Sequence, residues 1–246
     1  YSSPMKASAN GVSTTVQEFA DDLPVFELNQ AYNTTGNTVT PFPTLFTYEE
    51  GRLSSTLNTF DRGWLVPGLS EDLQPLRGYS AQTNANTVVD IAGVLQNGPV
   101  SYAVTRGSMS NSGWQLIGNP YPAPIDWDVV RSTGMLTGIE DAIYVHKPTG
   151  RYTGSYAAYV NGIGSNGGVK DLASMQGFFV RATQPTGAVS FTNAARHTSY
   201  TAPTVFRPGT PNPAAGQKPV IRLEARNAAG LADEAVVYFE AGAGLG

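Results

Sequence analysis

Two similar segments about one hundred residues apart constrain the fold of this chain more than any other feature. Gly51-Arg52, Arg77-Gly78-Tyr79 and Val89-Asp90-Ile91 recur in the same order as Gly150-Arg151, Gln176-Gly177-Phe178 and Val189-Ser190-Phe191. The offset is 99 residues for the first two segments and 100 residues for the third. Self-similarity at a nearly constant offset is typical of repeated structural units. We therefore predict two modules from an internal duplication, at residues 1–112 and 113–246.

Short strand patterns separated by turn residues occur in both predicted modules. Runs of β-branched and aromatic residues at 100–104, 178–182, 188–191 and 220–225 lie between clusters rich in Gly, Pro and Asn. The best helical patterns are short, at 16–20 and 127–130. Because no amphipathic helix is long enough for a crossover connection, we expect an all-β fold of tandem, jelly-roll-like β-sandwich modules.

The two ends of the chain have patterns of their own. Residues 1–5 open directly in apolar and turn residues, which predicts that the first module is truncated at its start. The prolines of 206–219 lack backbone donors and predict an extended tether. Alternating apolar and charged residues then predict a closing hairpin at 220–240, and the Gly-Ala run of 241–246 predicts a linker to a further domain.

Composition excludes several classes of function. Charged residues make up 14% of the chain, against roughly 25% in an average soluble protein. The net charge is −4, and the 15 Lys and Arg are too dispersed to form the basic stripe that a nucleic acid requires. The sequence has no cysteine, which excludes disulfides and thiolate zinc sites, and no apolar run of the ~18 residues that a membrane span needs.

The sequence contains no convincing catalytic motif. His146 and His197 are the two histidines, and they lie in different segments without metal-ligand spacing. Residues 162–167 match Gly-x-Gly-x-x-Gly, but no strand–helix–strand unit surrounds them, so we interpret them as a loop. We therefore predict that the chain is not an enzyme and has no catalytic or cofactor-binding residues.

Acidic pairs are the best candidates for metal ligands. Carboxylates close together in extracellular β-sandwich loops are typical of calcium sites. The candidate ligands are Asp21, Asp22, Glu49, Glu50, Asp126, Asp128, Glu140 and Asp141. None of them forms an Asp-x-Asp-x-Asp-Gly loop, so roles as turn acids or helix caps remain open, with Asp126 placed to cap a helix at Trp127. Calcium is the candidate ion if these acids bind a metal. If they do not, we predict a module with no cofactor.

The segment 113–127 resembles a family signature. It reads Gly113-Trp114-Gln115-Leu116-Ile117-Gly118-Asn119-Pro120-Tyr121-Pro122-Ala123-Pro124-Ile125-Asp126-Trp127. It is similar to a motif of large secreted surface proteins of Bacteroidota, found upstream of type IX secretion sorting domains. The resemblance implies an extracellular or outer-surface location. It implies as partners the other domains of the same polypeptide and the type IX secretion machinery. Within the segment we expect Trp114 and Trp127 to fill the core.

Three functional hypotheses follow. The first is a non-catalytic structural or adhesive module of a large secreted or cell-surface protein, whose partners include surface glycans or other surface proteins. The alternative is a carbohydrate-binding module, in which Tyr152, Tyr156 and Tyr159 are candidates for stacking on sugar rings. A hydrolase domain is the third hypothesis, and it has no nucleophile or metal cluster to support it.

Overall fold

The computed structural model describes residues 1–6, 14–23, 27–56, 59–83, 88–89, 91–150 and 153–198, and the backbone of 220–226 and 232–238. It divides into two compact units, Tyr1–Pro208 and Gly209–Gly246. The division therefore does not fall between 112 and 113, where we predicted a domain boundary. Strand β4 (Val100–Thr105) lies before that position, yet it pairs along its whole length with β13 (Thr186–Phe191). The two predicted modules thus share a sheet.

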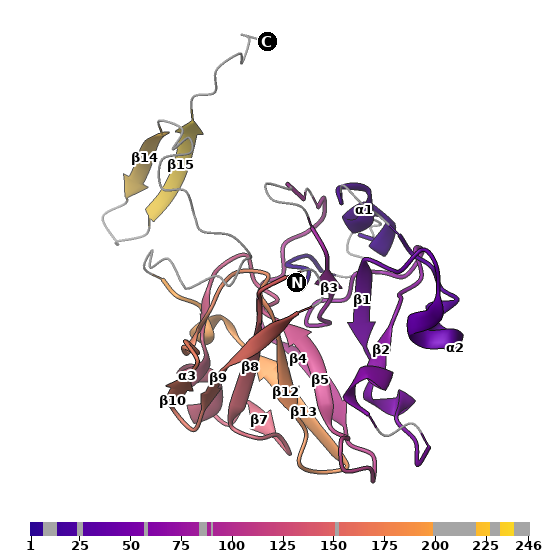
Figure 1. Cartoon of the computed structure of the whole chain (residues 1–246). Coiled ribbons are helices and arrows are strands. Elements are labelled where there is room, and N and C mark those ends of the chain that lie inside the picture. The colour runs from indigo at the N-terminus through magenta and orange to yellow at the C-terminus, as the bar shows by residue number, and fades with distance from the viewer. Residues whose placement is uncertain are drawn as a thin grey trace. The chain divides into compact units, whose positions relative to one another are not determined.

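A five-stranded antiparallel sheet is the centre of the first unit. Its order is β10-β9-β8-β12-β5, and Figure 1 shows β9, β8, β12 and β5 side by side. The strands are β5 (Trp114–Gly118), β8 (Ala142–Pro148), β9 (Gly154–Val160), β10 (Ile163–Ser165) and β12 (Gly177–Arg181). The predicted strand at 178–182 is therefore confirmed. His146 lies within β8. Part of the segment 162–167, which we interpreted as a loop, instead forms β10.

A second sheet packs against one face of the first. It has the order β4-β13-β7, with β7 at Leu136–Thr137, and its pairs are also antiparallel. One core contains Ile143, Phe178 and Val180 from the first sheet together with Val189 and Phe191 from the second. Alternate residues of a strand point to opposite faces, so each sheet buries the side chains of one of its faces in this core. The all-β class is confirmed; two separate tandem sandwiches are not.

One helix closes the end of this core. Strand β6 (Ile125–Asp126) pairs with β11 (Asp171–Leu172), and α3 (Trp127–Ser132) begins at the next residue. The predicted short helix is therefore confirmed. Trp127 is fully buried, and its ring lies 5.8 Å from that of Phe178, as expected for a residue that fills the core.

The N-terminal segment adds a smaller layer beside β5. It contains α1 (Val16–Asp21), α2 (Tyr32–Thr35), the 3₁₀ turns Gly36–Thr38, Glu50–Arg52 and Phe60–Gly63, and strands β1 (Leu45–Tyr48), β2 (Trp64–Leu65) and β3 (Ser80–Ala81). Strand β1 lies between β2 and β3 (Figure 1). Its own core includes Val16, Phe19 and Leu45. The backbone N–H of Gly78 donates to the carbonyl of Leu116 at 3.0 Å, which joins this layer to the edge of the large sheet.

The second unit is a hairpin. Strands β14 (Val220–Arg226) and β15 (Ala232–Tyr238) pair antiparallel, with Glu224 opposite Glu234. The predicted closing hairpin is therefore confirmed. The predicted tether 206–219 lies outside the described residues. In the part of the chain that the structure describes, no helix has the length and apolar character to cross a membrane.

Candidate functional site

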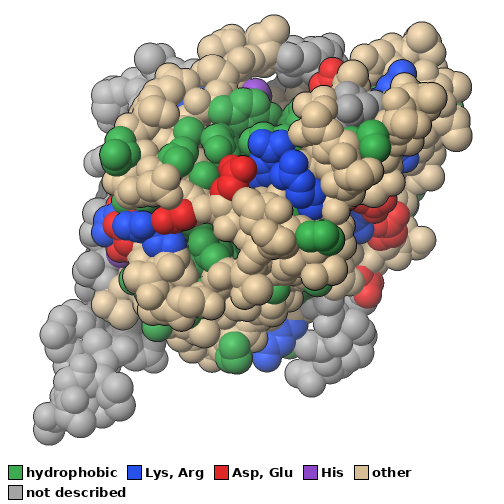
Figure 2. All heavy atoms as spheres, turned by 90° about the horizontal axis from the view of Figure 1, so that it is seen from below, with side chains coloured by type: hydrophobic (Ala, Val, Ile, Leu, Met, Phe, Trp, Pro, Cys, Tyr) green, Lys and Arg blue, Asp and Glu red, His purple; other side chains and the backbone are tan. Residues whose placement is uncertain are grey.

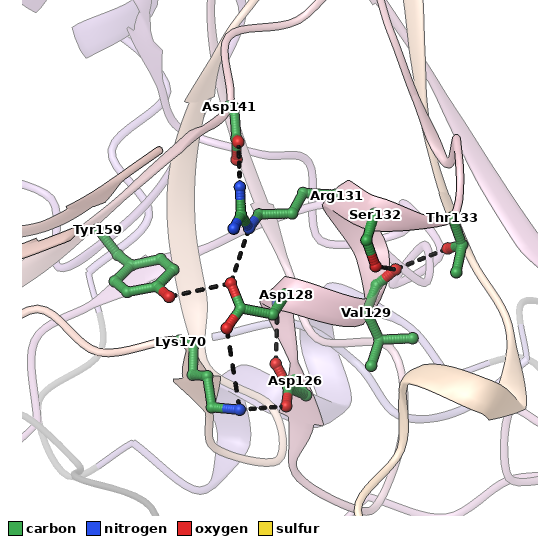
Figure 3. Close-up of polar contacts among 9 residues, drawn as sticks. All are labelled: Asp126, Asp128, Val129, Arg131, Ser132, Thr133, Asp141, Tyr159 and Lys170. Atoms are coloured by element: carbon green, nitrogen blue, oxygen red, sulfur yellow. Dashed lines mark hydrogen bonds and ion pairs between the residues drawn. The ribbon is translucent and has the colours of Figure 1, made fainter. Parts of the chain in front are cut away.

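A charged cluster surrounds the start of α3 and includes three of the predicted calcium ligands. Asp126 caps the helix, because its Oδ1 accepts a hydrogen bond from the backbone N–H of Asp128 at 2.8 Å. Its Oδ2 lies 2.6 Å from the Nζ of Lys170 (Figure 3). The hydrogen bond to Asp126 is the largest effect that raises the pKa of Lys170. The predicted capping role of Asp126 is therefore confirmed.

Asp128 has three partners in the same cluster. Its Oδ1 accepts from the Nε of Arg131 at 2.7 Å and from the hydroxyl of Tyr159 at 2.9 Å, while its Oδ2 lies 3.9 Å from Lys170 (Figure 3). Desolvation acts to raise the pKa of Asp128, but the hydrogen bonds from Arg131 and Tyr159 outweigh it and the pKa is lowered. Arg131 also donates to Asp141 at 2.7 Å. Each of the three carboxylates of the cluster thus pairs with one of two cations, Arg131 or Lys170.

The remaining predicted acids are dispersed. Glu49 pairs with Arg77 at 3.1 Å, whereas Glu50 is buried and accepts from the backbone N–H of Gly107 at 2.7 Å. Glu140 lies 3.8 Å from Arg181, on the side of the sheet away from Arg131. Asp21 accepts from Gln17, and Asp22 is the C-cap of α1. The pairs Glu49-Glu50 and Glu140-Asp141 are therefore divided between different partners.

A different trio has the geometry of metal ligands. One ligand atom from each of Asp126, Asp171 and His197 lies within 4.8 Å of the others. The Nε2 of His197 is 2.8 Å from the Oδ1 of Asp171, and Lys170 already neutralises Asp126. We missed Asp171 and His197 because they lie far from Asp126 in sequence. The pairing of β6 with β11 brings Asp171 beside Asp126, and a bridge between Ile125 and Arg196 brings His197 there. A divalent cation here would have to displace Lys170.

The outer face of the five-stranded sheet is the more informative surface. We define it by the residues that the strand register places on the side away from Ile143 and Val180. They are Trp114, Leu116, Tyr144, His146, Tyr156, Ala158, Phe179 and Arg181. Figure 2 shows one face of the molecule, on which hydrophobic side chains gather in a patch bordered by basic and acidic side chains.

Aromatic rings from the N-terminal layer cover part of the outer face. The ring centroids of Tyr48, Phe60 and Trp64 lie 5.3, 5.3 and 5.7 Å from that of Phe179. The rings are tilted or edge-to-face, the arrangement that aromatic quadrupoles favour. Phe179 is only 3% exposed as a result. This contact fixes the N-terminal layer against the large sheet.

As far as the described residues show, the rest of the outer face is partly or fully exposed, and we call it the open part. Tyr156 is 38% exposed, and its ring centroid lies 5.4 Å from His146 and 6.1 Å from Phe179. Trp114, which we expected in the core, is half-buried here with its ring 5.2 Å from that of Tyr144. Aromatic residues at both alternations of one strand, as in Phe178-Phe179, are the sequence signal for a sheet covered on both faces. That signal would have predicted the cover over Phe179, but not which side chains of this face stay accessible.

The structure separates the three candidate tyrosines. Tyr156 is on the open part of the outer face, Tyr159 is on the opposite face and donates to Asp128, and Tyr152 lies outside the described residues. Tyr159 is 9% exposed, so its ring has no free face for a ligand. Of the two candidate tyrosines that the structure describes, Tyr156 is therefore the one with an accessible ring.

Comparison with known proteins gives a family but no named relative. A family model described as a domain of unknown function, DUF8693, matches residues 1–246. No curated protein and no solved structure has a significant match to the chain. Because the family model covers the whole sequence, the chain belongs to the DUF8693 family of domains of unknown function.

Proposed function

We propose that this chain is a non-catalytic binding module, structural or adhesive, of a large secreted or cell-surface bacterial protein. The observation that carries the proposal is the open part of the outer face. There, the five-stranded sheet presents the side chains of Tyr144, His146 and Tyr156 beside Trp114. Accessible aromatic patches on a soluble domain are typical of interaction sites, and a sheet holds them in fixed positions.

The charged groups support binding rather than catalysis. Asp126, Asp128 and Asp141 each have a cation within 2.7 Å, and Glu50 is engaged with backbone amides. A general acid or base needs a carboxylate that can reach substrate with an adjusted pKa. These carboxylates instead hold the helix α3 and the 106–113 loop in place.

The cellular setting of the proposal comes from sequence. The resemblance of 113–127 to surface proteins of Bacteroidota supports an extracellular or outer-surface location and export by the type IX secretion machinery. The partners in this proposal are the other domains of the same polypeptide, together with surface glycans or other surface proteins. Carbohydrate binding is the second candidate function, and the accessible ring of Tyr156 favours it.

An internal duplication is also part of the proposal. Strand β1 pairs antiparallel with β3, and at the repeat offset β8 pairs antiparallel with β12. In both places a Gly-Arg dipeptide follows the first strand of the pair. The second strand has two residues in β3 and five in β12, so the copies would have diverged in length.

The proposal is tested by incubating the purified chain with panels of polysaccharides and peptides and measuring both products and retained ligand. We expect retention on one class of surface polymer, without release of reducing ends or new peptide termini. Turnover that scales with protein concentration and persists after further purification would overturn the non-catalytic assignment.

A further inference from the structure

The polar groups around the open part of the outer face narrow the choice of ligand. Arg181 and Glu140 lie at its border, with the guanidinium of Arg181 placed 5.3 Å from the centre of the Trp114 ring. Burial, together with the nearby carboxylate of Glu140, raises the pKa of Tyr144. The surface therefore combines the faces of aromatic rings with hydrogen-bond donors and hydrogen-bond acceptors.

We propose that the open part of the outer face, around Tyr144, His146 and Tyr156, binds the pyranose rings of an uncharged polysaccharide. The inference rests on the proposed binding function and names its ligand class. Sugar rings have one face of C–H groups, which suits an aromatic ring, and a rim of hydroxyls, which needs donors and acceptors. Both requirements are met on this surface by neighbouring residues.

Charge favours an uncharged ligand. Arg181 and Glu140 balance one another, and the remaining charge that acts on Tyr156 is the carboxylate of Asp61. Desolvation lowers the pKa of His146, which favours the neutral form of its ring. Among the residues that the structure describes around this surface, a polyanion would meet no net positive charge, and a polycation would have no group of carboxylates to pair with. A neutral glycan requires neither a net positive charge nor a group of carboxylates.

The geometry of the charged pair leaves hydrogen-bonding capacity for hydroxyls. The Nη1 of Arg181 is 3.8 Å from the Oε1 of Glu140, which is longer than a hydrogen bond. Meanwhile Nη2 of Arg181 donates to the carbonyl of Ser110 at 2.9 Å, which fixes the guanidinium in place. A sugar hydroxyl that accepts from Arg181 and donates to Glu140 would satisfy both groups.

Strand β9 and its neighbour extend the apolar part of the surface. Ala158 and Val160 lie on the same face as Tyr156, and Val160 pairs with Ile163 of β10. Ile163 is 74% exposed. A row of small and apolar side chains beside an aromatic ring fits several consecutive sugar units better than one, because it gives an extended, shallow surface.

The experiment is an array of neutral oligosaccharides, comprising gluco-, manno-, xylo- and galacto-configured series, probed with the full chain and with two tyrosine variants. Tyr156→Ala removes the accessible ring. Tyr1→Ala is the matched control, because Tyr1 is 42% exposed and contacts Phe19 in the N-terminal layer. Thermal unfolding establishes that both variants retain the fold.

We expect the wild-type chain and Tyr1→Ala to bind the same neutral series, with affinity at least tenfold lower for Tyr156→Ala. Equal binding by Tyr156→Ala would overturn the assignment of this face while leaving the binding function intact. Absence of binding to every neutral series would overturn the ligand class; retention on a peptide in the polysaccharide and peptide panels would then identify a peptide ligand. Turnover would instead contradict the proposed function.

Discussion

The carboxylate of Glu50 accepts a hydrogen bond from the backbone N–H of Gly107 at 2.7 Å and thereby joins two distant parts of the chain. Its Oε1 also accepts from the N–H of Gly113 at 3.3 Å, at the residue before β5. Glu50 is 6% exposed, whereas the side chain of its neighbour Glu49 is 51% exposed. One carboxylate therefore fixes the 106–113 loop to the N-terminal layer, and the adjacent one does not.

Replacing Glu50 should destabilise the fold far more than replacing Glu49. Glu50→Ala leaves backbone donors of the 106–113 loop without their acceptor, and we expect a loss of about 2–3 kcal/mol in the free energy of unfolding. Glu49→Ala removes a surface ion pair with Arg77 and should cost less than about 1 kcal/mol. Urea unfolding of the two variants measures the difference. Equal losses would show that the loop does not depend on the buried carboxylate.

Gly63 should tolerate no side chain, because a Cβ there would overlap the ring of Tyr48. Tyr48 is 4% exposed and packs against Phe179, so it cannot move without disturbing the outer face. We expect Gly63→Ala to lower the free energy of unfolding by about 1–3 kcal/mol. Gly51→Ala is the control, since no atom lies within 4 Å of its Cβ position. Unchanged stability in Gly63→Ala would contradict this packing.

Acidification should destabilise the protein partly through His146. Desolvation lowers the pKa of His146 from its ordinary value of 6.5, so the unfolded chain takes up this proton at a higher pH than the folded chain. Stability associated with His146 is thus present above about pH 6.5 and lost as the pH falls through the folded-state pKa. His146→Gln should flatten the decline in unfolding free energy between about pH 7 and pH 5. Parallel pH profiles for the two proteins would refute this assignment.

Divalent cations should not stabilise the wild-type chain through Asp126, Asp171 and His197. Lys170 lies 2.6 Å from Asp126 and competes with any cation. We expect no rise in melting temperature with calcium or zinc at about 1 mM. Lys170→Met removes the competing charge and should introduce a zinc-dependent rise, because imidazole and carboxylate ligands suit zinc. A calcium-dependent rise in the wild-type protein that is lost in Asp126→Asn would instead place a metal at this cluster.

The sequence predicted local elements well where one residue type decides the outcome. Asp126 before Trp127 predicted a capped helix, because a carboxylate at that position accepts from the first free N–H groups. Alternation at 220–225 predicted β14 for the same local reason. The repeat offset located comparable strand pairs, but it carries no information on which strand of one copy pairs with the other. The pairing of β4 with β13 therefore could not be predicted from the repeat offset.

The candidate site was predicted poorly for a geometric reason. Adjacent residues in extended chain point to opposite sides, so Glu140 contacts Arg181 while Asp141 contacts Arg131. Adjacent acids in such segments are consequently poor candidates for one metal ion. Asp126 and Asp128, two residues apart, do share a partner in Lys170. Trp114 was misplaced because a strand buried on both faces does not indicate which face is the core.

A fluorescence titration with a neutral oligosaccharide tests the central claim most directly. Trp114 lies on the outer face beside Tyr144, whereas Trp64 lies in the covered part against Phe179. We predict a saturable change in tryptophan emission on addition of the ligand, lost in Trp114→Phe and retained in Trp64→Phe. Saturable binding whose emission change survives in Trp114→Phe would place the ligand elsewhere on the molecule and contradict the account.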